Sequence, residues 1–136
     1  MTVVVRYLLI LALFATLDAA WLLGIGASFN RAQFGHLMRA DPVWSAAVTF
    51  YLIYGVAVLS LAVNPALSGG RMRDAAWRGA LLGLAAYGAF DLTSLAMFTA
   101  FPLPGAVVDM VWGTSVTATV SALAARDWGG ARAGNA

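Results

Sequence analysis

Four apolar stretches of about 20 residues leave this 136-residue chain few ways to fold. They run from Val3 to Ile25, Val43 to Val63, Ala76 to Phe98 and Gly105 to Ala124. A helix needs about 20 apolar residues to cross the roughly 30 Å hydrocarbon core of a bilayer, so each stretch has the length of one membrane span. The sequence therefore predicts an all-α integral membrane bundle of four transmembrane helices, forming one domain over residues 1–136.

The composition excludes a water-soluble globule. Hydrophobic residues make up 62% of the chain and charged residues 10%, whereas soluble domains average roughly 25% charged residues. The chain has no cysteine, which excludes a disulfide scaffold and thiolate metal sites. Its net charge of +2 is too small and too scattered to indicate nucleic-acid binding. We therefore expect membrane lipids as partners, and no nucleic acid.

The arginines predict the orientation. Six lie near the span ends shared by the two termini and the middle loop: Arg6, Arg71, Arg73, Arg78, Arg126 and Arg132. Only Arg31 and Arg39 lie on the opposite side. Because basic residues concentrate in cytoplasmic loops, both termini are predicted to be cytoplasmic. The exclusive use of Arg and Asp, with abundant Ala and Gly, is typical of a GC-rich bacterial genome. We thus expect a multi-pass protein of the bacterial inner membrane.

Two connecting segments carry local signals. The segment from Ser28 to Ala40 mixes apolar and polar residues, which predicts a short helix in the outer interface between the first and second spans. Asn64 and Pro65 follow the second span, and this pair is predicted to end its helix.

Three aspartates fall inside the predicted spans: Asp18, Asp91 and Asp109. An acidic residue at this depth costs a few kcal/mol on insertion scales, so it is a functional-site hypothesis by default. At 1.5 Å rise per residue, Asp18 and Asp91 lie about 10 Å below the outer boundary and Asp109 about 6 Å below it. The predicted topology therefore brings all three acids to a similar height in the outer half of the membrane.

Aromatic residues accompany these acids. Tyr87 lies four residues before Asp91 on one helical face, and Tyr51 and Tyr54 lie in the outer half of the second span. Asp-x-x-Trp occurs twice, and its i, i+3 spacing places Trp21 beside Asp18 and Trp112 beside Asp109. An indole N–H can donate to either carboxylate. These residues form the predicted ligand- or cation-binding site: Asp18, Asp91, Asp109, Tyr87, Tyr51, Tyr54, Trp21 and Trp112.

Each feature also has a purely structural interpretation. Tryptophans near span ends commonly anchor a helix at the interface. An acid near a helix start, such as Asp109, interacts favourably with the positive end of the helix dipole. Gly79 and Gly83 form a Gly-x-x-x-Gly motif that packs helices and carries no chemistry. The structural alternative therefore stays open for every member of the cluster.

Cofactor and metal motifs are missing from the sequence. Gly24-x-Gly26 lacks the third glycine and the preceding strand of a dinucleotide-binding fingerprint, and the chain has no P-loop and no His-Glu-x-x-His. With one histidine and no cysteine, a zinc centre would rest on carboxylates throughout, which zinc disfavours. We therefore predict no cofactor and no metal site.

Three ordered motifs resemble a known family. They are Leu17-Asp18-Ala-Ala-Trp21-Leu22 on the first span, Asp91-Leu92-Thr93 followed by Leu95-Ala96 on the third, and Asp109-x-x-Trp112-Gly113 on the fourth. Together they resemble the uncharacterised bacterial membrane-protein family catalogued as domain of unknown function 2177, over nearly the whole chain. The resemblance implies a four-span membrane protein and brings no biochemical activity with it.

Three classes of function remain open. The leading hypothesis is an acidic intramembrane site that binds or passes a cation, a proton or a small polar ligand. A transport path in so short a chain would require a homodimer, for which Gly79 and Gly83 offer an interface. The alternatives are a membrane-embedded lipid-modifying enzyme, whose aspartates act as general acid and base, and an accessory subunit without chemistry. Whether the protein is an enzyme stays undecided, although no nucleophile–base pair is visible.

Overall fold

The computed structural model describes residues 1–69 and 72–126. Arg71 and Arg132, which contributed to the predicted orientation, lie outside the described residues. The elements are α1 (Val3–Ala20), the π-helix η1 (Trp21–Ile25), α2 (Ala27–Phe34), the 3-10 turn η2 (Gly35–Leu37), α3 (Trp44–Ala57), the π-helix η3 (Val58–Val63), α4 (Asn64–Leu67), α5 (Met72–Met97) and α6 (Leu103–Ala125). Every element in these two ranges is helical.

The described residues contain four helical segments long and apolar enough to cross a membrane. They are Val3–Ile25, Trp44–Leu67, Met72–Met97 and Leu103–Ala125. This confirms the predicted all-α bundle. The first and second spans each combine an α-helix with a π-helical stretch, since η1 continues α1, and η3 and α4 continue α3.

The second span continues past the predicted stop at Asn64 and Pro65. Both residues belong to α4, with Pro65 in its first turn. A proline inside a helix lacks its own N–H and clashes with the carbonyl four residues earlier, here that of Leu61. Leu61 lies in the π-helix η3, whose wider turn relieves that clash and keeps the chain helical to Leu67.

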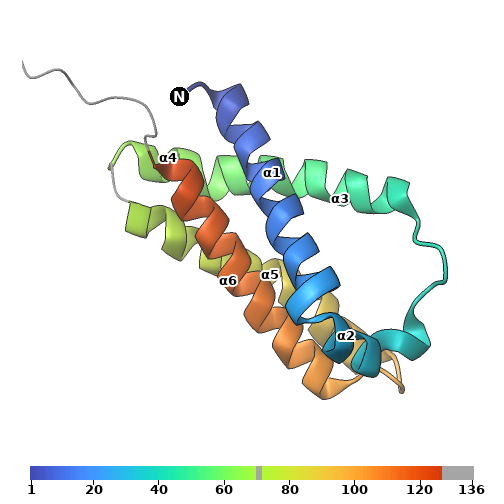
Figure 1. Cartoon of the computed structure of the whole chain (residues 1–136). Coiled ribbons are helices and arrows are strands. Elements are labelled where there is room, and N and C mark those ends of the chain that lie inside the picture. The colour runs from blue at the N-terminus through green and yellow to red at the C-terminus, as the bar shows by residue number, and fades with distance from the viewer. Residues whose placement is uncertain (70–71, 127–136) are drawn as a thin grey trace, which may run out of the picture.

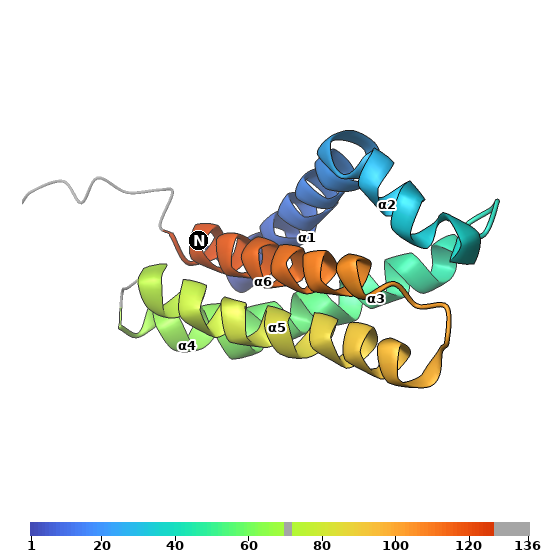
Figure 2. The same ribbon diagram turned by 90° about the horizontal axis from the view of Figure 1, so that it is seen from below.

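Among the described elements, helices α5 and α6 share the most extensive contact, and they run side by side in both views (Figures 1 and 2). Glycines permit this approach. A Cβ atom added at Gly79 would overlap Ser121, and one added at Gly83 would meet the carbonyl oxygen of Gly113 and the side chain of Thr117. The face that carries Gly79 and Gly83 is therefore buried within one chain. A homodimer stays a prediction, and it would need another surface.

The other two spans cover this pair unequally. Helix α1 crosses α6, and the buried core between them contains Ile10, Phe14 and Val120. On the second span, η3 packs against α5, but α3 makes no comparably close backbone approach to α5 within the described residues. Figure 2 shows α3 diverging from α5 towards the end of the bundle at which α2 lies. We call this end the α2 end; the start of α1 and the end of α6 lie at the other.

A sharp turn at Gly26 separates the first span from α2. The Trp21 ring lies so close to Gly26 that a Cβ atom there would be 2.7 Å from it. Helix α2 then leads to η2, where His36 Nε2 lies 2.9 Å from the carbonyl oxygen of Ala100 in the α5–α6 connection. The predicted short helix between the first two spans is thus present, and it covers the α2 end of the bundle.

Candidate functional site

Asp18 joins three helices through its carboxyl group. Tyr51 of α3 donates its hydroxyl to one oxygen at 2.7 Å, and Trp112 of α6 donates its indole N–H to the other at 2.9 Å. The residue is 6% exposed. Each oxygen of this buried acid therefore has a donor from a different helix, as burial of a polar group requires.

The two tryptophans stack on each other across the α1–α6 contact. The ring centroids of Trp21 and Trp112 lie 4.8 Å apart, with 12° between the ring planes. Trp21 starts the π-helix η1. Because π turns are frequent at functional sites, this local departure from α-helical geometry agrees with the cluster of polar residues around it.

A cavity of about 180 Å³ lies among these side chains, within the bundle. It is lined by Asp18, Trp21, Leu22, Tyr51, Tyr87, Asp109 and Trp112. We call it the acidic cavity. Residues of all four spans contribute to its wall, and two of its lining residues are acids while none is basic.

Asp91 lies outside this lining and is buried completely, with 0% of its surface exposed. Neither of its carboxyl oxygens has a hydrogen-bond partner of standard geometry. The acid that acts on it electrostatically is Asp109, which lies on the cavity wall. An unpaired buried polar group is costly, so Asp91 requires an explanation beyond packing.

The three tyrosines occupy different environments. Tyr51 and Tyr87 line the acidic cavity, and the Tyr87 ring packs directly on Gly113, where a Cβ atom would overlap it. Tyr54 is 5% exposed, and its hydroxyl lies 2.9 Å from that of Thr117 in the core. Tyr54 is therefore bonded away from the acidic cavity, which its position in the sequence alone did not indicate.

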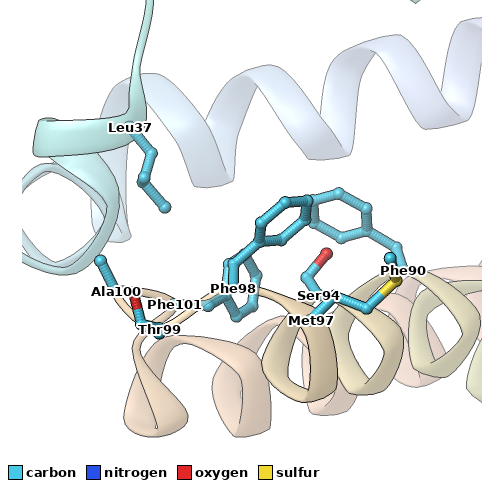
Figure 3. Close-up of a pocket in the computed structure, with 8 residues that line it drawn as sticks. All are labelled: Leu37, Phe90, Ser94, Met97, Phe98, Thr99, Ala100 and Phe101. Carbon is cyan, nitrogen blue, oxygen red and sulfur yellow. The ribbon is translucent and has the colours of Figure 1, made fainter.

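Two apolar cavities adjoin the site. The first, of about 310 Å³, is lined by Phe50, Ala86, Tyr87, Phe90 and Asp109. The second, of about 480 Å³, is lined by Leu37, Phe90, Ser94, Met97, Phe98, Thr99, Ala100 and Phe101, and Figure 3 shows Leu37 above it and the other residues around the end of α5. Sequence analysis identified none of Phe50, Ala86 and Phe90. The one available signal is adjacency, since Phe50 precedes Tyr51 and Phe90 precedes Asp91.

The acids do not form a metal-chelating set. Within the described ranges, no group of three or more His, Cys, Asp or Glu side chains is arranged to hold a metal ion. Asp18 and Asp109 line one cavity, and Asp91 lies outside that lining and interacts with Asp109.

The fold and the buried polar cluster define a four-span membrane protein with an acidic, aromatic cavity between its helices. The chain belongs to the family described as "Predicted membrane protein (DUF2177)", which matches residues 3–126. No curated protein and no solved structure matches the chain. The family description gives membrane location and no activity, so any function must be argued from the cavity.

Proposed function

We propose that the protein binds a small organic cation, of the protonated or quaternary ammonium class, in the acidic cavity. The observation that carries the proposal is that Asp18 and Asp109 line one cavity between membrane-spanning helices, while Asp91, buried outside that lining, interacts with Asp109.

The composition of the cavity wall supports a cation. Its ionisable groups are the two carboxyl groups and the hydroxyls of Tyr51 and Tyr87, with no basic side chain to neutralise them. The remaining wall is largely aromatic, including the Trp21–Trp112 stack. Aromatic faces attract ammonium groups, and rings of this kind are the usual recognition device for quaternary ammonium ligands. The low dielectric constant of the surroundings strengthens the attraction between the ligand and the carboxylates.

The Asp91–Asp109 pair adds a second property. Two neighbouring carboxyl groups in a nonpolar environment can share one proton, because a carboxylic acid donates a hydrogen bond to a carboxylate. A cation that enters beside Asp109 competes with that proton. Binding is therefore expected to be coupled to proton release, which suits a site that exchanges a cation for a proton.

The test is thermal unfolding of the purified protein in detergent, with choline as the probe. A ligand bound only by the folded state raises the melting temperature with its concentration. Choline should stabilise the wild-type protein in a saturable manner, whereas neohexanol, in which carbon replaces nitrogen, should not. Sodium chloride at the same ionic strength controls for screening.

Variants assign the effect to the cavity. Asp109→Asn should remove the choline response while the protein stays folded. Asp41→Asn is the matched control, because Asp41 is exposed in the connection before α3. If choline gives no shift, or the same shift in Asp109→Asn as in wild type, the binding proposal fails. The cluster then has a structural role only, in which the two hydrogen bonds to Asp18 hold the helices together.

A further inference from the structure

The smaller apolar cavity adjoins the acidic cavity at Tyr87 and Asp109, which line both. Its other lining residues are apolar: Phe50 from α3, and Ala86 and Phe90 from α5. A molecule at Asp109 therefore has acid groups on one side and an apolar space of about 310 Å³ on the other.

This apolar space opens on the surface of the bundle. Phe50 is 46% exposed and Phe90 is 60% exposed, although both lie within membrane spans. They belong to α3 and α5, the two helices that diverge towards the α2 end. Phe90 lies seven residues before the end of α5, about 10 Å along the helix axis. We call this gap, lined by Phe50, Ala86 and Phe90, the lateral opening; at this depth it faces hydrocarbon.

We infer that the ligand is a single-chain cationic amphiphile whose ammonium group lies between Asp18 and Asp109 and whose alkyl chain leaves through the lateral opening into the membrane. This inference rests on the proposed function and names the class of ligand. Charge complementarity places the head group, because the carboxyl groups lie at the inner end of the path and the apolar residues at its outer end.

The apolar lining of the passage favours an amphiphile over a wholly water-soluble cation. An apolar passage holds water poorly, since water needs polar partners, whereas an alkyl chain fills it without losing hydrogen bonds. Asp91 is completely buried and interacts with Asp109, so the two acids can share one proton and keep one negative charge between them where the head group would arrive. The larger apolar cavity under Leu37 shares only Phe90 with the lateral opening and includes no acid, so the chain is not assigned to it.

Photo-crosslinking tests the path. The protein is placed in phosphatidylcholine vesicles with a hexadecyl trimethylammonium probe that carries a diazirine near the middle of its chain, and the adducts are mapped by mass spectrometry. The expected result is labelling concentrated on Phe50, Ala86 and Phe90. A probe of the same chain length with a hydroxyl head group should label these residues at most a few-fold above the other lipid-facing residues, such as Ile53 and Val111, which are 66% and 61% exposed.

A blocked opening separates the chain from the head group. Ala86→Trp fills the lateral opening, and Ala85→Trp places the same ring on the exposed neighbouring position. Ala86→Trp should reduce labelling by the cationic probe at least several-fold while choline still raises the melting temperature; Ala85→Trp should change neither. Phe90→Trp, at an exposed wall position, is a second blocking variant should Ala86→Trp fail to fold.

The outcomes distinguish the two proposals. Labelling that is spread evenly over lipid-facing residues, or that is equal for the cationic and hydroxyl probes, overturns the amphiphile inference. If choline still stabilises the protein in that case, the cation site stands and only the chain path is wrong. If choline also has no effect, the cation site itself fails.

Discussion

The indole of Trp112 on α6 donates a hydrogen bond to Asp18 on α1, 94 residues earlier in the chain, at 2.9 Å. The same carboxyl group accepts the hydroxyl of Tyr51 from α3. Three spans are therefore held together by one buried acid, and the neighbouring buried acid, Asp91, has no such donors. The two aspartates should respond in opposite ways to the same substitution.

Asp18→Asn should destabilise the protein by about 1 kcal/mol. The amide oxygen can accept a hydrogen bond from only one of the two donors, Tyr51 and Trp112, and the amide NH₂ group then faces the other donor. Asp91→Asn should leave stability unchanged or raise it, since it replaces a buried ionisable group, beside another acid, by a neutral group of the same shape. The measurement is the melting temperature of both variants in one detergent. Destabilisation of Asp91→Asn beyond that of Asp18→Asn would contradict this reading of the two sites.

The two stacked tryptophans should differ in the same way. Trp112→Phe loses the hydrogen bond to Asp18 and leaves that oxygen unpaired, at a cost of about 1 kcal/mol beyond the lost ring contact. Trp21→Phe keeps an aromatic ring against Trp112, and no hydrogen bond from its indole to Asp18 is present among the described contacts. Denaturation midpoints compare the pair. Equal losses would show that stacking alone determines the contribution of both rings.

Glycine substitutions test the close contacts around the site. Gly113→Ala places a methyl group into the Tyr87 ring, and overpacking of this kind costs about 1–3 kcal/mol. Gly24→Ala meets no atom within 4 Å and gains helix propensity, so it should be neutral or slightly stabilising. Thermal unfolding of both variants checks the contrast. A neutral Gly113→Ala would mean that α5 and α6 separate more easily than their contacts indicate.

Choline affinity should increase with pH. The cation and the proton compete for the Asp91–Asp109 pair, so raising the pH removes the competitor and favours the cation. When one proton is displaced per ligand, the affinity rises up to about tenfold per pH unit over the range in which the pair titrates. The measurement is the choline-dependent melting shift at several pH values. In Asp91→Asn the choline-dependent melting shift should change less with pH. An unchanged pH dependence would show that the proton released on binding does not come from the Asp91–Asp109 pair.

The predicted orientation is tested by reporter fusions. A reporter after Ala136 should be cytoplasmic, and one inserted at Gly35 should face the opposite side, because most arginines lie near the termini and the middle loop. Opposite readings would reverse the protein and move the acidic cavity to the cytoplasmic half of the membrane.

The four spans could be predicted from the sequence because bilayer thickness fixes the length of an apolar helix, whatever the helix packs against. The same arithmetic predicts the height of the acids in the membrane, and that height stays a prediction. The partners of the acids could not be predicted in this way. The i, i+3 rule compares positions on one helix, so it placed Trp112 beside Asp109, whereas the structure bonds Trp112 to Asp18 across two helices.

The lateral opening could not be predicted from the sequence for a different reason. It depends on the angle at which α3 leaves α5, and side-chain periodicity does not determine that angle. The sequence alone therefore does not distinguish Phe50 and Phe90 from other lipid-facing residues; the relative positions of α3 and α5 are needed. In the same way, the path through Pro65 depends on the π turn before it, which has no sequence signature here.

The bonds between the first and last spans have a consequence for biogenesis. Arg6 and Asp18 are both buried on α1, and each is bonded to α6. Arg6 donates a hydrogen bond to the carbonyl oxygen of Ala124, and Asp18 accepts one from the indole of Trp112. A ribosome completes α1 long before it has made α6. Until α6 is inserted, Arg6 and Asp18 lack the hydrogen bonds that α6 supplies, so a chain truncated before α6 would be less stable in the membrane than the complete bundle.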